Sequence, residues 1–466
     1  MRDQSHEQPA VAHGPSRDGG RPAMSSGSNG FGSLWMDGAD GRVALAAREP
    51  RWHLVALAAA CAFLCSLPLS AFLVSVTYLV LAGVSLIRAK AVWPTTRPFR
   101  ALWIPWLIAA WIVWTGASIA WSPDPIQGWE ELRSFRMALI PLLLWPVLIH
   151  PKLLLGGMLA GVAAQQLMQA FQGLEWFGLD ASDTMGRLGG LMHPITTGLW
   201  SGVGATFWLA VILCGRSRWR WLAIVPLGAS MLSLLATGSR GPWLAAAVVL
   251  PVMVIGLTIA RREARLPGAI MIAAGLMGAG ILWPIVGDSV RARLDAAATE
   301  LERAVEEEVY TTSVGLRIGQ TRWCLELIGD APLIGHGAGA FETAQQEVES
   351  HQRAVERRPD KTTYLTRGQP HSTPLHVLVT TGALGGAIAA LVIGLSLWRA
   401  ARMTLGRRRW RDAEPLMAAV PFAIVLWVIG SFFDSYHLSG DRAGLLFVLA
   451  AMAIARPGAS ADREVE

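Results

Sequence analysis

Long apolar runs without a charged side chain recur along this chain of 466 residues. Each run is about 20 residues long, which is the length that an α-helix needs to cross the hydrocarbon core of a bilayer. Charged residues make up only 16% of the chain, whereas soluble domains carry roughly 25%. The pattern therefore predicts an all-α polytopic membrane protein.

The runs divide into about twelve predicted transmembrane helices. The uncharged stretch 52–87 is split at Ser66–Ser70, because a proline beside small polar residues favours a tight hairpin. An even number of spans places both termini on the same side. The predicted spans are 52–69, 71–87, 101–120, 137–149, 153–174, 194–214, 221–237, 242–260, 268–287, 374–398, 415–433 and 443–455.

The basic residues lie between alternate runs, as the positive-inside rule requires. If the N-terminus is cytoplasmic, the short outer loops hold almost no basic residues beyond Arg187, Arg240 and Arg442. The net charge of +6 then reflects topology, and nucleic-acid binding is not expected. The predicted inner loops hold Arg88, Lys90, Arg97, Arg100, Lys152, Arg216, Arg218, Arg220, Arg261, Arg262, Arg265, Arg399, Arg402, Arg407, Arg408, Arg409 and Arg411.

These spans leave one large outer loop, residues 288–370. Within it the residue pattern predicts helices over Ser289–Tyr310, Val314–Gly329 and Phe341–Arg357, and a glycine-rich turn over Pro332–Gly339. A loop of this length with its own helices is usually functional. The expected organisation is a disordered cytoplasmic tail (1–50), spans one to nine (51–287), the periplasmic loop domain (288–370), spans ten to twelve (371–455) and a second cytoplasmic tail (456–466).

Three residues at the predicted outer face could carry chemistry. Arg240 lies in Thr237-Gly-Ser-Arg-Gly-Pro, and a guanidinium group there could bind phosphate oxygens in a bidentate way or simply snorkel to the interface. His371 lies where the chain re-enters the membrane and could act as a general base or as an interfacial cap. Arg317 lies in the loop's second helix, where a solvated or salt-bridged arginine is the ordinary alternative.

Four further residues are weaker candidates for substrate binding. Asp434 follows the eleventh span and could orient His371, pair with an arginine, or be an ordinary polar residue at a helix end. His193, before Pro194, reads more readily as a turn residue. Arg133 and Arg136 precede the fourth span and could add phosphate contacts.

Together these motifs resemble the O-antigen ligase family of bacterial membrane enzymes over about residues 50–455. Arg240-Gly-Pro-Trp-Leu244 is similar to the family's Arg-x-x-x-Leu motif, and His371 with Gly382 is similar to its His-x10-Gly motif. Arg317 and the turn that runs from Pro332 to Phe341 resemble the signature of its large periplasmic loop. One departure is Thr321, where many relatives have tryptophan.

The resemblance implies a GT-C-like inner-membrane enzyme of a Gram-negative bacterium with its active site facing the periplasm. Its members transfer a glycan from undecaprenyl diphosphate to a sugar hydroxyl of lipid A–core. The expected roles are His371 as general base and Arg240 and Arg317 as ligands of the diphosphate, with inversion at the anomeric carbon. The expected partners are the lipid-linked donor, the lipid A–core acceptor and the bilayer.

No metal or other cofactor is expected. Asp-x-Asp, His-Glu-x-x-His and P-loop motifs are absent from the sequence, and His371 and His376 lie on different faces of a helix. Three alternatives stay open. An O-antigen polymerase would have two outer loops of comparable size, and a protein O-oligosaccharyltransferase would carry extra extracytoplasmic sequence after the last span. A transporter would place its polar residues near the membrane midplane.

Overall fold

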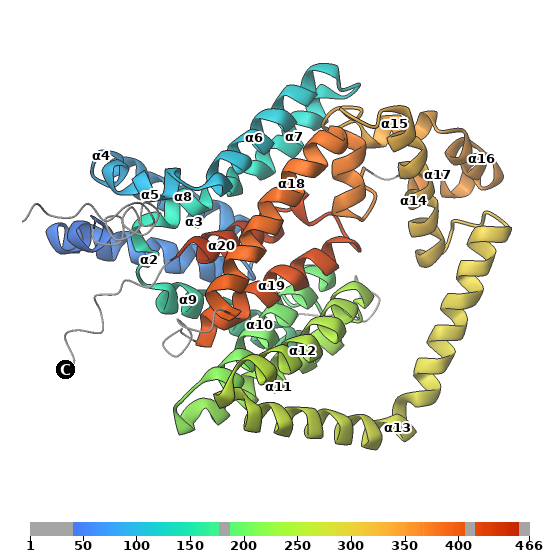
Figure 1. Cartoon of the computed structure of the whole chain (residues 1–466). Coiled ribbons are helices and arrows are strands. Elements are labelled where there is room, and N and C mark those ends of the chain that lie inside the picture. Colours follow the sequence, from blue (N-terminus) through green and yellow to red (C-terminus); the bar gives the residue numbers. More distant parts are fainter. Residues whose placement is uncertain (1–40, 177–186, 367, 406–414, 456–466) are drawn as a thin grey trace, which may run out of the picture.

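A computed structural model of the chain describes residues 41–176, 187–366, 368–405 and 415–455. This part of the chain is built from helices, with short 3-10 segments between them (Figure 1). The α-helices are α2 (Pro50–Ser66), α3 (Ala71–Ile87), α4 (Ala89–Val92), α5 (Arg97–Arg100), α6 (Trp103–Ser118), α7 (Pro125–Ser134), α8 (Ile140–Leu144), α9 (Pro151–Gly173), α10 (Pro194–Cys214), α11 (Ile224–Ala236), α12 (Arg240–Ala260), α13 (Arg265–Glu306), α14 (Ser313–Asp330), α15 (Phe341–Glu347), α16 (Glu349–Arg357), α17 (Thr362–Leu365), α18 (Thr373–Leu405), α19 (Pro415–Ser431) and α20 (Gly440–Ile454).

The described residues include six helical segments that are long and apolar enough to cross a membrane. A seventh is obtained if α3 and the segment that follows it, which bend by 69° at their junction, count as one span. The fold class is therefore all-α with several candidate spans, while the number twelve stays a prediction. The six segments are Trp103–Trp121, Pro151–Gly173, Pro194–Cys214, Arg218–Ala236, Arg240–Ala260 and Thr373–Thr404.

Several predicted spans correspond to shorter or interrupted helices. The run 137–149 lies in a 3-10 segment, the five-residue α8 and a second 3-10 segment. Pro141 and Pro146 explain the interruptions, because proline lacks the N–H that a continuous α-helix needs. Helices α2 and α19 have 17 residues each, at the lower end of the length range of membrane-spanning helices.

Helix α10 forms the centre of the bundle. Nearly all of its residues are buried, and it packs against α9, α11, α12 and α19. A helix that is apolar all round is stable only when other helices surround it. Helix α18 lies beside this group and packs on α6, α19 and α20, so the last three long helices close the bundle against its first half.

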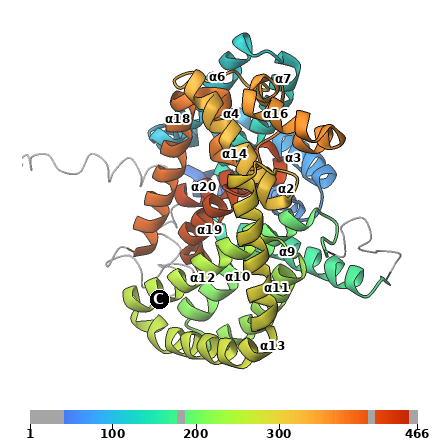
Figure 2. The same ribbon diagram turned by 90° about the vertical axis from the view of Figure 1, so that its right-hand side faces the viewer.

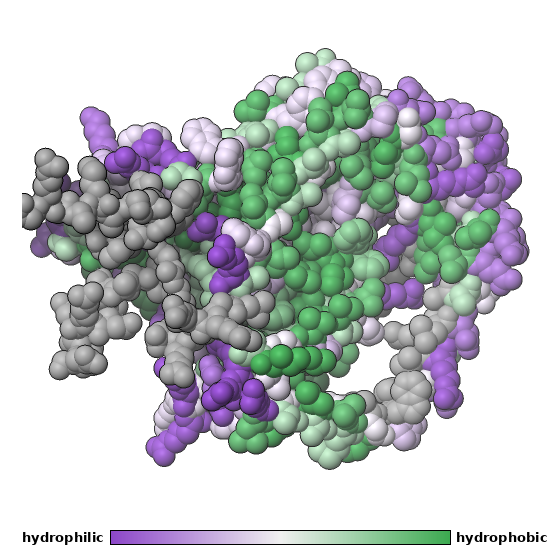
Figure 3. Space-filling view, viewed as in Figure 1, coloured by the Kyte–Doolittle hydropathy of each residue, from purple (hydrophilic) through white to green (hydrophobic). Residues whose placement is uncertain are grey.

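The surface divides into a hydrophobic middle and hydrophilic ends. In Figure 3 hydrophobic residues cover the central helices, and hydrophilic residues gather at the right, over the segment that contains α14 to α17. Figure 2 looks onto that hydrophilic end, where α14 and α16 face the viewer. An apolar belt between polar ends is the surface expected of a helix bundle in a bilayer.

The local predictions from sequence are partly confirmed. The hairpin between α2 and α3 is present, and α14 has almost the predicted bounds. The helix predicted over Ser289–Tyr310 is confirmed as far as Glu306, but it is not a separate helix, since α13 runs without interruption through both the apolar run and this charged segment. It contains Pro284 and changes direction between its two halves (Figure 1), which is how a helix accommodates an internal proline.

Two other boundaries also differ from the predictions. The helix predicted over Phe341–Arg357 is broken at Val348, whose ψ of 122° is that of an extended residue, so α15 and α16 are separate. Residues 41–48 are helical although their composition placed them in the disordered tail. The rest of that tail (1–40) and the second tail (456–466) lie outside the described residues.

The large loop has its own small hydrophobic core. Buried residues from the end of α13, from α14 and from α15 to α17 pack around Trp323 and Phe341, which are fully buried. Val379 of α18 belongs to the same cluster. Because α18 takes part in this core, the loop is packed directly onto the helix that begins next to His371.

Candidate active site

His371 and Asp434 meet between the start of α18 and the end of α19. The Nδ1 atom of His371 lies 3.2 Å from Oδ1 of Asp434, and Nη1 of Arg442 donates to Oδ2 of the same carboxylate. The sequence left open whether Asp434 would contact the histidine or an arginine; in the structure it contacts both. His371 has a φ of 47°, in the left-handed region that non-glycine residues rarely adopt and that is often associated with functional sites.

Backbone contacts hold this pair in place. The hydroxyl of Thr373 donates to the carbonyl oxygen of Asp434 at 3.2 Å and accepts from the N–H of Tyr436 at 2.9 Å. The N–H of Ser435 donates to Oδ1 of Asp434 at 2.9 Å. The first turn of α18 and the segment after α19 are thus joined around the imidazole.

The carboxylate of Asp434 is ionised. Burial by itself would raise its pKa, but the hydrogen bond from His371 and the charge of Arg442 outweigh burial and hold the pKa well below its usual range. A carboxylate at Nδ1 favours the imidazole tautomer with its proton on Nδ1, which leaves Nε2 as the basic atom. The His371 side chain is 28% exposed, so a reacting hydroxyl can reach it.

Arg240 and Arg317 lie near this pair. Burial lowers the pKa of Arg317, and among the charges that act on it Asp434 raises the pKa while Arg240 lowers it. Arg240 is the exposed first residue of α12. Within the described part of the chain, neither guanidinium group forms a hydrogen bond or an ion pair. Guanidinium groups without a carboxylate partner are chemically suited to binding an anion such as phosphate.

Among the remaining candidates from the sequence, His193 lies near the site and also has a structural role. The pKa of His193 is lowered by burial and by Arg187, with smaller effects from Asp434 and His371, so His193 belongs to the same neighbourhood. It also caps α10 by accepting the N–H of Ile195 at 3.3 Å, whereas the sequence favoured a turn residue at this position.

Arg133 and Arg136 contact other parts of the bundle. Arg133 is exposed and pairs with Glu130 on its own helix at 3.9 Å. Arg136 donates to Ser75 of α3 at 3.4 Å, and one of its nitrogen atoms lies close to Gly440 at the start of α20. The described contacts do not bring either arginine together with His371.

The sequence missed two arginines that the structure brings to the site. Arg442 binds Asp434 directly. Arg187 donates to the carbonyl oxygen of Thr237 at 3.0 Å and to Oγ of Ser239 at 2.6 Å, on the turn that precedes Arg240. We define the arginine cluster as Arg187, Arg240 and Arg317.

Gly382 and the glycine-rich turn of the loop are parts of one junction. Helix α18 is broken at Gly382, where φ is 66° and ψ is −170°, and the break exposes backbone groups inside the protein. The turn after α14 satisfies them through backbone hydrogen bonds of 2.8–3.2 Å from His336 N to Val379 O, Gly337 N to Thr380 O, Ala383 N to Pro332 O and Leu384 N to Leu333 O. Gly382, eleven residues after His371 in the sequence, therefore acts in the architecture of the site.

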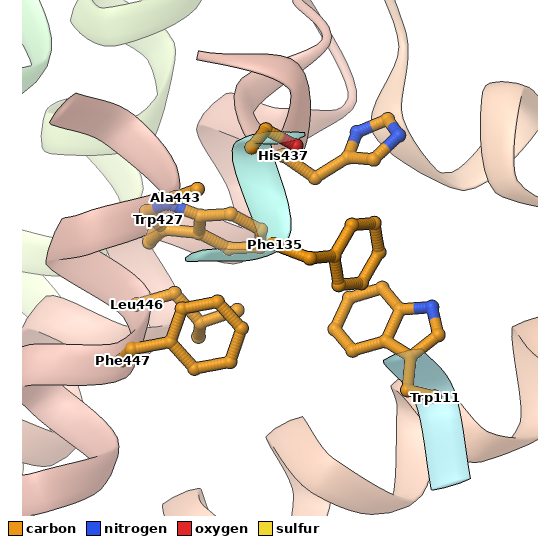
Figure 4. Close-up of a pocket in the computed structure, with 8 residues that line it drawn as sticks. Trp111, Phe135, Trp427, His437, Ala443, Leu446 and Phe447 are labelled. Atoms are coloured by element: carbon orange, nitrogen blue, oxygen red, sulfur yellow. The ribbon is translucent and has the colours of Figure 1, made fainter. Parts of the chain in front are cut away.

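A second polar cluster lies buried behind the site. Glu131 of α7 accepts the N–H of Gly339 at 3.0 Å and lies 3.1 Å from Nε2 of His376. The rings of His376 and His437 are 4.9 Å apart. His437 also lines a small pocket with the rings of Trp111, Phe135, Trp427 and Phe447, which are drawn in Figure 4. This cluster fastens the glycine-rich turn to α7.

Comparison with known families identifies the matching part of the chain. Residues 226–390 match the family model described as O-antigen ligase. The match runs from α11 to the middle of α18 and includes Arg240, Arg317, His371 and Gly382. The comparison with curated proteins gave no match. The segment 226–390 is therefore similar to the O-antigen ligase family.

Proposed function

We propose that this protein is an O-antigen ligase that transfers a glycan from undecaprenyl diphosphate to a sugar hydroxyl of lipid A–core. The observation that carries the proposal is the placement of His371, paired with the buried Asp434, beside Arg240 and Arg317. This arrangement supplies a base for a hydroxyl and cations for a phosphate leaving group in one neighbourhood. The apolar bundle would accommodate the lipid tail of the donor.

In the proposed reaction, Nε2 of His371 takes the proton from the acceptor hydroxyl as its oxygen attacks the anomeric carbon. The bond between that carbon and the diphosphate oxygen breaks, and the bonding electrons leave with undecaprenyl diphosphate. Arg240 and Arg317 stabilise the negative charge that develops on the leaving group. Attack from the face opposite an α-linked diphosphate inverts the anomeric configuration. Asp434 keeps Nδ1 protonated and stabilises the imidazolium that forms.

The proposed topology has twelve spans, a periplasmic active site and both termini in the cytoplasm of a Gram-negative bacterium. The positive-inside pattern of the sequence supports it, as does the gathering of hydrophilic residues over the loop helices in Figure 3. The loop domain 288–370 would then cover the outer end of the bundle.

Two relatives use the same type of donor and are the nearest alternatives. An O-antigen polymerase is disfavoured by the single large loop, since two loops of similar size are expected there. A protein O-oligosaccharyltransferase would differ in its acceptor alone, so the same arginines and histidine would serve it. A transporter is disfavoured because the polar candidates gather near the ends of α12, α14, α18 and α19 and not at the middle of a span.

Arg240→Ala and Arg317→Ala are each expected to abolish or strongly reduce capping of lipopolysaccharide in a ligase-deficient strain. The physical reason is the loss of a charge-assisted contact to the leaving group, which costs about 10²- to 10³-fold in rate when one such donor is removed. Lipopolysaccharide on a gel measures the capped product, and the level of lipid-linked glycan should rise.

The matched control is Arg353→Ala, which removes an arginine that pairs with Glu349 on the exposed α16. This variant should cap lipopolysaccharide as the wild type does. Full capping by the Arg240 and Arg317 variants would refute the proposed site. Failure of the wild type itself, with normal expression, would argue for one of the alternative acceptors.

Removal of divalent ions is expected to leave the transfer rate unchanged. In many transfers with a phosphate leaving group, a metal ion neutralises the negative charge of that group. In the proposed chemistry, arginine side chains neutralise it instead. The measurement is the rate of glycan transfer by the purified protein before and after exhaustive chelation. Loss of activity that a single divalent ion restores would contradict the proposal.

A further inference from the structure

We infer that Arg187 is a third diphosphate-binding arginine of this site, presented by a segment that buried glutamines of α9 hold in place. The inference rests on the proposed function and adds a residue that neither the motifs nor the family match includes, since Arg187 precedes the matched segment. We refer to residues 187–193 as the strap.

The strap is fixed to α9 by three glutamines. Gln165, Gln169 and Gln172 are buried, and their spacing of four and three residues puts them on one face of the helix. Their side chains form hydrogen bonds of 2.6–3.3 Å with backbone groups of the strap. Gln165 donates to Gly189 O and accepts from Leu191 N, and Gln169 donates to Leu188 O. Gln172 accepts from Gly189 N and Gly190 N.

This network favours a single conformation of the strap, because a buried polar group without a hydrogen-bond partner lowers the stability of the fold. A buried amide without a partner is destabilising, so the glutamines and the strap hold one another in a single conformation. The network continues into the bundle, where Gln165 also donates to Thr197 of α10 at 2.9 Å and Gln169 to Ser233 O of α11 at 3.1 Å. Polar side chains within a span are usually functional. Here the three glutamines fix the position of Arg187, the first residue of the strap.

Arg187 points from the strap onto the turn that carries Arg240. Its Nε and Nη2 atoms bind Thr237 O and Ser239 Oγ, and the N–H of Leu188 donates to Ala236 O at 3.2 Å. Gly238 has a φ of 58°, and its Cα faces the Arg187 side chain. The guanidinium is therefore held beside Arg240 in a defined orientation.

The charge balance of the neighbourhood favours an anionic ligand. Burial lowers the pKa of Arg187, and the like charge of Arg317 lowers it further, so each guanidinium group lies within range of the other's charge. The nearby acid among the described residues, Asp434, is already engaged by His371 and Arg442. Arg187, Arg240 and Arg317 together present positive charge to which a diphosphate, with several negative oxygens, is complementary.

Binding of inorganic pyrophosphate to the purified full-length protein tests the inference. Calorimetry gives a Kd that does not depend on glycan transfer, and inhibition of transfer by pyrophosphate gives a second measure. Arg187→Gln is expected to weaken pyrophosphate binding and to raise the KM for the lipid-linked donor by about tenfold, with a smaller change in kcat, because one charge-assisted contact is lost.

Three further variants separate ligand binding from a purely structural role. Arg187→Lys keeps the charge and should recover part of the affinity, although an ammonium group cannot reproduce the planar guanidinium contacts. Gln172→Met frees the strap and should weaken pyrophosphate binding without removing a charge. Arg358→Gln, which alters an exposed arginine paired with Asp360, is the control and should bind as the wild type does.

The outcomes distinguish this inference from the proposed function. Unchanged pyrophosphate affinity in Arg187→Gln, with a lower melting temperature, would mean that Arg187 only supports the turn, and the inference would be overturned. Pyrophosphate binding that depends on Arg187 in a protein that transfers no glycan would support the anion site and overturn the proposed acceptor chemistry.

Discussion

Replacing His371 with glutamine is expected to lower the rate of glycan transfer by about 10²- to 10⁴-fold, the usual contribution of a general base. Glutamine keeps a polar side chain of similar size and can still contact Asp434, but it cannot take a proton from the acceptor. Affinity for the lipid-linked donor should change little, because the arginine cluster is untouched. The measurement is kcat and KM of the purified protein with a lipid-linked donor and a lipid A–core acceptor.

Two companion variants sharpen this prediction. Asp434→Asn should lower kcat less than His371→Gln does, since the base remains but the carboxylate that fixes its tautomer is lost. His150→Gln is the control, because it alters an imidazole that pairs with His53 at 3.0 Å instead of with Asp434. A His371→Gln protein that transfers glycan at most of the wild-type rate would exclude His371 as the base.

Much of the helical framework could be predicted from hydropathy and turn residues. The proline and serines between α2 and α3 predicted their hairpin, and Gly329 with Pro332 predicted the end of α14. Hydropathy, however, reports where a segment is apolar and not whether a helix continues into polar surroundings. For this reason the continuous course of α13 past Pro284 was missed.

The breaks at Val348 and Gly382 depend on tertiary contacts that no local pattern contains. The broken backbone of α18 is stable because the turn after α14 supplies hydrogen bonds to it. The spacing of His371 and Gly382 was visible in the sequence, but the partner of Gly382 lies about fifty residues earlier in the chain. The spacing therefore identified the His371–Gly382 motif, but it did not reveal that His371 lies in the site while Gly382 forms the junction with the turn after α14.

The missed arginines of the site had a signal in the sequence. The predicted outer loop before the fourth span holds Arg133 and Arg136, and the other short outer loops hold three further basic residues that depart from the positive-inside pattern: Arg187, Arg240 and Arg442. All three contact or approach the His371 region in the structure: Arg442 binds Asp434, and Arg187 binds the turn before Arg240. A basic residue on the disfavoured side needs a compensating function. Applying that reasoning to all three, and not to Arg240 alone, would have found the site more fully.

Replacing Gly339 with alanine is expected to destabilise the protein and to reduce transfer without touching any residue that binds substrate. Gly339 has a φ of 82°, and a Cβ atom there would lie 2.2 Å from the backbone N of Gly128 in α7. The backbone conformation alone costs about 1–3 kcal/mol for a residue with a side chain, and backbone atoms cannot move aside as a flexible side chain could. Thermal unfolding and the transfer rate measure the two effects.

The expected loss of activity follows from the contacts of the turn. Displacing Gly339 from α7 breaks its hydrogen bond to Glu131, and the same turn supplies the backbone partners of α18 at Gly382. Since α18 begins next to His371, a displaced turn misplaces the base. The control is Gly394→Ala in α18. A Cβ atom at Gly394 would meet nothing within 4 Å, so alanine should be tolerated or slightly stabilising there. Equal melting temperatures and rates for the two variants would show that the turn does not hold the site together.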